Sequence, residues 1–236
     1  MSGHRANSLN LWWTTVPPAQ QWRAEPCLAL LDSGERERAR RAVKARHRQR
    51  FLVAHAGLRM VLAHHLDVAP KEIALRRGAC PLCGLAHGKP QVIGHESLHF
   101  SMSHSDDGVL FAVYDGAVGV DLERYPPRED SAQRLGRYLH ANEQRLLAAA
   151  PRHERDAAFL RFWLRKEAYL KAIGVGLAHG ITPGNVDIES VPGWRTLSLT
   201  VPAGFQASAV VAADSAELLS IRHTLLAAPG SDSHVG

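Results

Sequence analysis

Hydrophobic residues recur at helical spacing in several stretches of this chain. Phe51, Leu58, Leu62 and Leu66 form one such stripe, and Pro70 follows it, as is common just beyond the end of a helix. The same period predicts three further helices, over residues 35–50, 131–149 and 154–173. The last of these is apolar on nearly all sides from Phe159 to Ile173, so that stretch should be mostly buried.

Shorter runs of alternating hydrophobic and polar residues predict strands. Residues 98–123 hold three such runs, separated by the turns Asp106-Asp107-Gly108 and Asp115-Gly116, and they predict a three-stranded meander. Further strands are expected near residues 73–76, 185–190, 195–201, 207–213 and 218–225. Together these elements predict an α+β protein.

The turn at Tyr114-Asp115-Gly116 is the expected joint between two parts of the chain. Residues 1–115 form an N-terminal α+β half, and residues 116–228 form a C-terminal α+β half, although no sequence repeat relates them. The last residues, 229–236, are small and polar and are expected to be a disordered tail.

The strand expected over residues 118–123 carries two carboxylates on one face. Its three apolar residues should face the core, whereas Gly119, Asp121 and Glu123 share the opposite face. Alternate residues of a strand lie roughly 6.6 Å apart, at about 3.3 Å per residue. With a third carboxylate from elsewhere, that spacing suits a hard divalent cation. Gly119, which lacks a side chain, should let a ligand approach the strand.

Glu167 and Lys171 lie one turn apart on the helix expected over 154–173. Charges in a mostly buried helix cost free energy unless they are paired, metal-bound or facing a cleft. Only five of the 28 basic residues are lysines, and they include Lys89 and Lys171, which indicates a need for a compact ammonium at these positions. Glu167 can complete a three-carboxylate Mg²⁺ site with the strand, and the alternative is an ordinary surface ion pair.

Four motifs occur in an order and spacing that resemble the Sfp-type 4′-phosphopantetheinyl transferases. They are Gly88-Lys89-Pro90, Phe100 to Ser105, Gly119 to Glu123, and Trp163 to Lys171. The resemblance implies two similar α+β halves related by a pseudo-twofold axis, with the active site between them. It also implies transfer of the 4′-phosphopantetheine arm of coenzyme A to a serine of an acyl or peptidyl carrier protein, with release of 3′,5′-ADP.

The resemblance further implies roles for single residues. Asp121, Glu123 and Glu167 would hold Mg²⁺ against the pyrophosphate, with Asp121, Glu167 and Lys171 as the catalytic residues. Glu167, directly or through a metal-bound water, would be the base toward the serine, and Lys171 would assist the leaving group. The residues expected to bind coenzyme A are Arg38, Arg50, Lys89, Ser103, His104 and Lys171, with His104 on the 3′-phosphate. The carrier protein would dock near Tyr125 to Tyr138.

Composition is compatible with a transferase of this kind, such as one of secondary metabolite biosynthesis. The net charge of +5 favours anionic partners, a class that includes nucleic acid, coenzyme A and acidic carrier proteins. No run of 18 apolar residues occurs, and the first residues lack the apolar core of a signal peptide. Three cysteines do not make a disulfide framework. The lack of a membrane span and of a signal-peptide core predicts a cytoplasmic protein that binds no membrane. We also expect a monomer that does not bind nucleic acid.

A Mg²⁺-dependent nuclease is the alternative function, because it would also combine acidic ligands, a lysine and a basic surface. The basic run from Arg36 to Arg50 fits either nucleic-acid contact or a solvated helix face. Such nucleases usually keep Asp and Glu-x-Lys on neighbouring strands, whereas Lys171 follows Glu167 by four residues on a helix.

Cys80, Cys83 and His87 have the spacing of a zinc knuckle. A structural zinc site needs four ligands, and His95 or His99 is the available fourth. The alternative is a reduced turn without metal.

Overall fold

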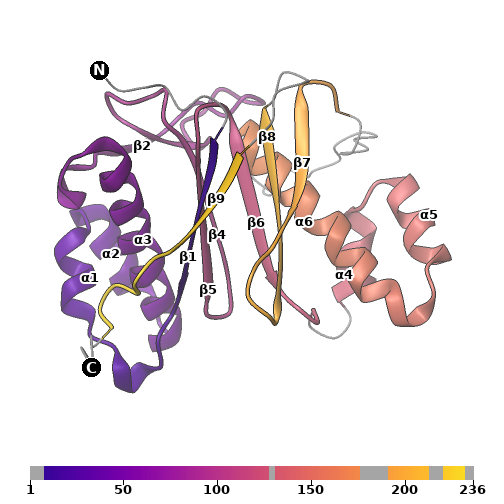
Figure 1. Ribbon diagram of the computed structural model, residues 1–236, viewed down its shortest axis with the longest axis horizontal. Helices are drawn as coiled ribbons and strands as arrows, with labels where there is room; N and C mark the ends of the chain where they lie inside the picture. Colours follow the sequence, from indigo (N-terminus) through magenta and orange to yellow (C-terminus); the bar gives the residue numbers. More distant parts are fainter. Residues whose placement is uncertain (1–7, 128–130, 176–190, 213–219, 232–236) are drawn as a thin grey trace.

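The computed structural model describes residues 8–127, 131–175, 191–212 and 220–231. In this part of the chain, two sheets lie side by side at the centre, and helices cover their outer faces (Figure 1). The mixture of helices and sheets confirms the α+β fold class predicted from the sequence. The strand expected near residues 185–190 lies outside the described residues.

The first sheet has the strand order β4–β5–β1–β9. Its strands are β1 (Ser8–Thr15), β4 (His99–Ser105), β5 (Gly108–Tyr114) and β9 (Ser220–Leu225). β1 pairs antiparallel with β5 and parallel with β9, so the last described strand joins the sheet of the N-terminal half. The sequence pattern did not lead us to expect β1, although its buried residues Leu9, Leu11 and Trp13 alternate. A separate two-stranded hairpin consists of β2 (Leu75–Arg77) and β3 (Pro90–Val92).

Three helices pack on the first sheet, and they are α1 (Ala24–Leu30), α2 (Ser33–Arg41) and α3 (Ala45–Leu66). Leu52, Leu58 and Leu62 of α3 are buried against Phe100 and Phe111 of the sheet. The apolar stripe predicted in the sequence is thus the core-facing side of α3. Burial of side chains of this size stabilises the fold by roughly 1.5–3 kcal/mol each.

The prediction of one helix over residues 35–50 is wrong. α2 ends at Arg41, and α3 begins at Ala45, with extended backbone at Ala42 and Lys44 between them. Val43 in the link between them is 95% exposed. Asp32 caps the start of α2, because its side-chain oxygen accepts a hydrogen bond from the Glu35 N–H.

A buried ion network fixes α2 against α3. The Arg59 side chain, which is fully buried, donates to Glu35 Oε2 at 2.6 Å and to Asp32 Oδ2 at 2.7 Å. Although burial opposes ionisation, hydrogen bonds from His55 and Arg59 lower the pKa of Glu35 to about 2. The charges of Asp32, Glu35 and Arg59 are therefore satisfied within the helical layer, where they hold α2 on α3.

The second sheet has the order β6–β8–β7 and is antiparallel throughout. Its strands are β6 (Val118–Arg124), β7 (Trp194–Leu199) and β8 (Phe205–Ala212). The three-stranded meander predicted over 98–123 is therefore wrong: β4 and β5 form a hairpin, but β6 pairs with β8 in the other sheet. The local pattern cannot specify a partner so distant along the chain.

Helices of the C-terminal half cover the second sheet and extend beyond it (Figure 1). They are α4 (Ser131–Leu135), α5 (Ala141–Ala149) and α6 (Arg155–Ile173). Short 3₁₀ helices in the described chain lie at Ala19–Gln21, Pro70–Glu72, Gly136–Tyr138 and Arg152–Glu154. α6 packs directly on β6 and β8, and it ends at Gly174, whose φ of 81° suits glycine.

Gly119 of β6 is the point of closest approach between strand and helix. A Cβ atom added there would lie 1.9 Å from the Ala168 carbonyl oxygen and 2.5 Å from the Ala172 nitrogen. The expectation that Gly119 admits a ligand is therefore wrong, because α6 occupies that space. The absence of a side chain at 119 instead brings the charged face of α6 onto β6.

The end of the described chain lies against α1. Trp22 Nε1 donates to the Pro229 carbonyl at 3.0 Å, and the Arg23 N–H donates to the Gly230 carbonyl at 2.8 Å. Residues 229–231, at the start of the tail expected to be disordered, are thus held by the N-terminal half, and residues 232–236 lie outside the described chain.

Candidate active site at the junction of the two sheets

Serine side chains join the two sheets where β4 passes β6. Ser101, Ser103 and Ser105 alternate along β4, and each hydroxyl accepts a backbone N–H of β6. The donors are the N–H groups of residues 120, 122 and 124, at 3.0, 3.2 and 3.1 Å respectively. We call this contact the β4–β6 seam. It satisfies β6 on the edge that has no backbone partner among the described strands.

Two of these hydroxyls also hold the carboxylates of β6. Ser103 Oγ donates to Asp121 Oδ1 at 2.8 Å, and Ser105 Oγ donates to Glu123 Oε2 at 2.8 Å. Each hydroxyl has one proton and two lone pairs, so it can accept from the backbone while it donates to the acid. Ser103 was predicted as a site residue, but Ser105 was not. The sequence feature that could have indicated Ser105 is that the serines of β4 and the acids of β6 both occur at every second residue.

α6 brings its charged turn onto the same carboxylate. Lys171 Nζ donates to Asp121 Oδ1 at 2.7 Å and to Ser103 Oγ at 2.9 Å. Glu167 lies one turn earlier on α6 and is only 8% exposed. The structure thus brings together four predicted site residues from three elements far apart in the sequence.

Burial and neighbouring charges perturb Glu167 strongly. Desolvation, followed by the negative charge of Asp121, raises the pKa of Glu167 to about 7, and the charge of Lys171 offsets this only in part. Within the described residues, Glu167 Oε1 and Asp121 Oδ2 are buried and have no hydrogen-bond partner. A buried polar atom without a partner costs roughly 1–3 kcal/mol, so a bound cation beside these oxygens would relieve a real cost.

The donor set is suitable for Mg²⁺, which prefers carboxylate oxygen and keeps several waters. Asp121, Glu123 and Glu167 do not each place an oxygen within 4.8 Å of the other two, and Lys171 already contacts one oxygen of Asp121. The residues therefore fit a hydrated cation better than an ion enclosed by three direct protein ligands.

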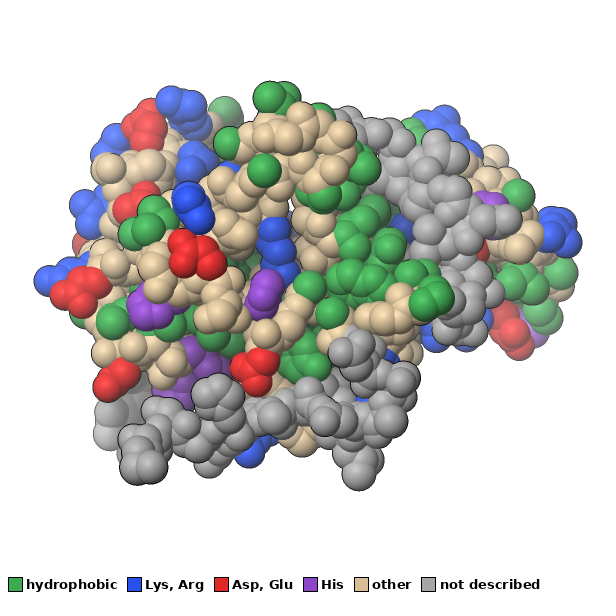
Figure 2. Space-filling model, turned by 90° about the horizontal axis from the view of Figure 1, so that it is seen from above, with side chains coloured by type: hydrophobic (Ala, Val, Ile, Leu, Met, Phe, Trp, Pro, Cys, Tyr) green, Lys and Arg blue, Asp and Glu red, His purple; other side chains and the backbone are tan. Residues whose placement is uncertain are grey.

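A cavity of about 370 Å³ opens beside Lys171, and we call it the basic cavity. Its cationic and histidine lining residues are Arg38, His55, Arg76, Arg77, His87, Lys89 and Lys171. Seen from above, the molecule carries Lys or Arg and His side chains near the centre of this face, next to hydrophobic side chains (Figure 2). A concave surface with this charge suits a ligand with several phosphates.

Lys89 links the basic cavity to β6. Its Nζ donates to the Val118 carbonyl at 2.7 Å, and burial lowers the pKa of Lys89 to about 8. The ammonium is therefore held at the first residue of β6 rather than free at the surface. Among the predicted ligands of coenzyme A, Arg38, Lys89 and Lys171 line this cavity.

His104 and Arg50 lie toward the end of β4 and do not line the basic cavity. Arg50 forms an ion pair with Asp106 at 3.3 Å. Although His104 is exposed as a residue, desolvation of its ring and the positive charges of Lys171, His55 and Arg50 lower the pKa of His104. This concentration of positive charge favours an anion nearby.

A second cavity, of about 340 Å³, lies on the other side of the carboxylates. Its lining includes Ser105 and Glu123 from the seam and Pro127, Leu135 and Trp163 from the C-terminal half. Lys171 therefore borders the basic cavity, and Glu123 borders this second cavity. We call the second one the outer cavity.

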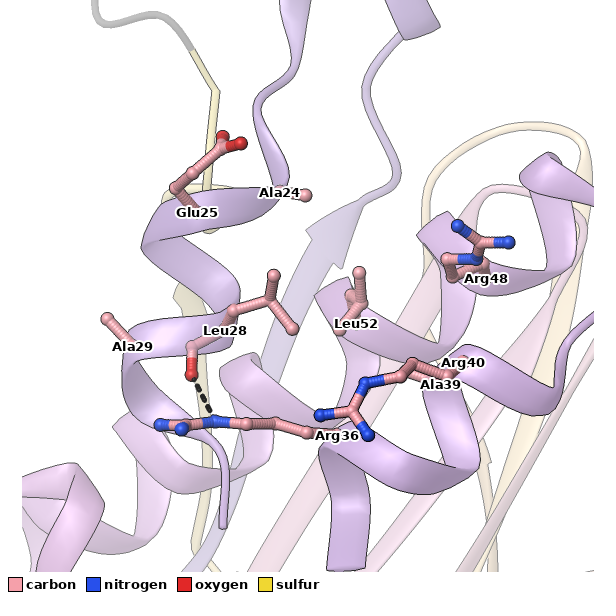
Figure 3. Close-up of a pocket in the computed structure, with 9 residues that line it drawn as sticks. All are labelled: Ala24, Glu25, Leu28, Ala29, Arg36, Ala39, Arg40, Arg48 and Leu52. Atoms are coloured by element: carbon pink, nitrogen blue, oxygen red, sulfur yellow. Dashed lines mark hydrogen bonds between the residues drawn. The ribbon is translucent and has the colours of Figure 1, made fainter. Parts of the chain in front are cut away.

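A third hollow, of about 500 Å³, lies between α1, α2 and α3 and contains none of the predicted site residues (Figure 3). Leu28 and Leu52 form its apolar floor. At one side, Arg36 Nε donates a hydrogen bond to the Leu28 carbonyl at 2.9 Å. On α6, Lys166 also has a structural role, in a buried pair with Glu143 at 2.6 Å.

Comparison with known proteins yields one family. Residues 117–213 match the model of the 4′-phosphopantetheinyl transferase superfamily. The 4′-phosphopantetheinyl transferase HetI of Nostoc sp. is 30% identical over 219 residues, which cover 88% of this chain and 89% of HetI. The 4′-phosphopantetheinyl transferase Sfp of Bacillus subtilis is 25% identical over 161 residues, 68% of each chain.

A third relative is the 4′-phosphopantetheinyl transferase psf-1 of Bacillus pumilus, 36% identical over 96 residues that cover 41% of this chain and 40% of psf-1. These relatives carry the name of a transferase, and none of them is named a nuclease. Within the described residues, no helix has the length and apolar character that a membrane span requires.

Proposed function

This chain belongs to the 4′-phosphopantetheinyl transferase superfamily, and we propose that it transfers the 4′-phosphopantetheine arm of coenzyme A to a serine of an acyl or peptidyl carrier protein. The observation that carries the proposal is the cluster of Asp121, Glu167 and Lys171 at the β4–β6 seam, with Lys171 on the basic cavity and Glu123 on the outer cavity. The nuclease alternative has no support from the relatives, and Glu167 and Lys171 lie on a helix.

The reaction forms a bond between the serine oxygen and the β-phosphorus of coenzyme A, and it breaks the bond from that phosphorus to 3′,5′-ADP. The serine proton must go to a base. Glu167, directly or through a bound water, would take this proton, because its carboxylate lies beside Asp121 and Lys171 in the same cluster.

Negative charge on the phosphate oxygens has to be stabilised during the transfer. Asp121 and Glu167 would hold Mg²⁺, with Glu123 completing the acidic set. When bound, the ion neutralises charge on the pyrophosphate. Lys171, which contacts Asp121, lies at the edge of the basic cavity and would balance the charge that develops on the leaving 3′,5′-ADP.

The basic cavity supports a role in binding the nucleotide part of coenzyme A. Lys89 and Arg38 line it and would contact phosphates before the reaction begins. Ser103 positions Lys171 and Asp121 rather than a phosphate, because its hydroxyl is already committed to both. His104, together with Arg50, is assigned to the 3′-phosphate on the strength of the positive charge around its ring.

The carrier protein would approach from the side of the outer cavity. Pro127 and Leu135 line that cavity, and Tyr125 and Tyr138 beside it are 37% and 49% exposed. Apolar and aromatic side chains at the surface suit the core of a protein interface. This approach would bring the carrier serine to the acids from the side opposite the nucleotide.

Intact-mass analysis of a panel of apo carrier proteins tests the proposal. Each carrier is mixed with this protein, coenzyme A and Mg²⁺, and at least one should gain the mass of one phosphopantetheine arm only when Mg²⁺ is present. No mass gain on any carrier, together with cleavage of a DNA substrate, would favour the nuclease. A monomeric state and a location in the cytoplasm stay predictions of the sequence.

A further inference from the structure

The hairpin between β2 and β3 brings two thiols and an imidazole together. Cys80 Sγ, Cys83 Sγ and a ring nitrogen of His87 all lie within 4.8 Å of one another. Cys83 Sγ is 3.0 Å from His87 Nε2. The function proposed above uses neither cysteine, so the arrangement calls for a role of its own.

The loop backbone, rather than the three side chains alone, creates this arrangement. The Cys80 N–H donates to the Leu85 carbonyl at 2.7 Å, and the Gly84 N–H donates to the Cys80 carbonyl at 2.8 Å. Gly84 has a φ of +75°, which a residue with a side chain rarely adopts. The His87 N–H donates a hydrogen bond to the Leu85 carbonyl at 2.8 Å, which closes the turn. The donor atoms are therefore preorganised.

Two sulfurs and one imidazole are ligands that favour zinc over the hard cations. Cysteine binds zinc as the thiolate. Backbone N–H groups of Leu82 and Cys83 hydrogen-bond to the Cys80 side chain. These bonds orient the one sulfur of the cluster that is buried.

We propose that Cys80, Cys83 and His87 bind one Zn²⁺ ion, with water as the fourth ligand. Within the part of the chain that the structure describes, no further His, Cys, Asp or Glu joins this cluster, so His95 and His99 are not its fourth ligand. Cys83 is exposed, which leaves the remaining coordination position accessible to solvent.

The zinc would fix the loop that presents Lys89 to the basic cavity. His87 itself lines that cavity. The loop returns to the hairpin through bonds from the Gly88 N–H to the Gly78 carbonyl and from the Gly78 N–H to the Lys89 carbonyl, both 2.9 Å. The metal would lock the open end of this hairpin, and this role goes beyond the proposed transferase function.

Metal analysis of the intact protein tests the site. After expression with zinc and dialysis without chelator, the wild-type protein should hold one zinc per chain by elemental mass spectrometry. Co²⁺ exchanged into the site should give thiolate-to-metal charge-transfer absorption and the strong visible bands of a tetrahedral ion. Both signals should be lost in Cys83→Ser, whose exposed position lets the variant fold.

Two variants provide matched controls. Cys27→Ser removes a thiol that lies in the N-terminal core, and His95→Ala removes an exposed histidine outside the cluster, so both should keep one zinc and the cobalt spectrum. Thermal unfolding of every variant checks that it is folded. Because zinc content does not depend on transfer, the outcome is independent of the transferase proposal.

Three results would overturn the site. The first is zinc far below one per chain in the wild-type protein. The second is full zinc content in the double variant Cys83→Ser/His87→Ala. The third is a Cys80–Cys83 disulfide, detected as a loss of two hydrogens in the mass of the freshly isolated protein, since oxidised sulfurs cannot bind the ion as thiolates.

Discussion

Replacing Glu167 with glutamine should stabilise the metal-free protein at alkaline pH. Burial beside Asp121 raises the pKa of Glu167 from 4.5 to about 7, so the folded protein holds this proton more tightly than the unfolded chain does. The stability that the neutral carboxyl contributes is present below pH 4.5 and is lost as the pH rises through 7. The glutamine of Glu167→Gln has no ionisable group, so it stays neutral at every pH.

The expected size follows from the shift in pKa. At about 1.4 kcal/mol per unit, the ionised Glu167 should cost about 3 kcal/mol at pH 8 and less than about 1 kcal/mol at pH 5. The free energy of unfolding of Glu167→Gln, relative to wild type, should therefore increase between these two pH values. The effect of the glutamine on packing is the same at both and cancels.

Urea denaturation in the presence of a chelator, at pH 5 and pH 8, measures this difference. Adding Mg²⁺ at pH 8 should then stabilise the wild-type protein but not Glu167→Gln, because the ion removes the repulsion among the acids. Glu25→Gln, at an exposed position on α1, is the control and should respond to neither change. A stability difference between Glu167→Gln and wild type that does not increase from pH 5 to pH 8 without metal would refute the reasoning.

Four further predictions concern the same site. Lys171→Ala should lower kcat about 100-fold with little change in coenzyme A affinity, measured by single-turnover transfer and calorimetry; unchanged saturated rates would make Lys171 a ground-state anchor. Lys89→Ala should weaken coenzyme A binding about tenfold, and wild-type affinity should decline above pH 8 as Lys89 loses its proton, a decline that the variant should lack. Ser103→Ala should cost about 1–3 kcal/mol of stability in urea, since the Leu122 N–H loses its acceptor. Gly119→Ala should lower the melting temperature strongly and separate α6 from β6; a variant with wild-type stability would show that α6 can move away without cost.

The sequence was informative where function depends on short-range spacing. Glu167 and Lys171 are one helical turn apart, and Asp121 and Glu123 are alternate residues of a strand, so the period alone placed each pair on one face. The family resemblance connected the two pairs. Their contact through Lys171 and Asp121 is a long-range feature that no local pattern contains.

The errors share one physical cause, which is that pairing between distant segments is not encoded locally. β6 was assigned to a meander with its sequence neighbours, but its partner β8 lies far along the chain. Gly119 was interpreted as space for a ligand, although α6 fills that space. Ser101 and Ser105 were missed because serines are common on strand surfaces. Their role is visible only once β4 is known to lie against β6.

Intact-mass measurement with Asp121→Asn tests the central claim most directly. The asparagine keeps the shape of the side chain but removes the charge that contacts Lys171 at 2.7 Å and one of the proposed ligands of Mg²⁺. With a carrier that the wild-type protein modifies, Asp121→Asn should give no phosphopantetheine mass gain in the same time while remaining folded by circular dichroism. Transfer by Asp121→Asn at the wild-type rate, with the same dependence on Mg²⁺, would contradict a catalytic site at the β4–β6 seam.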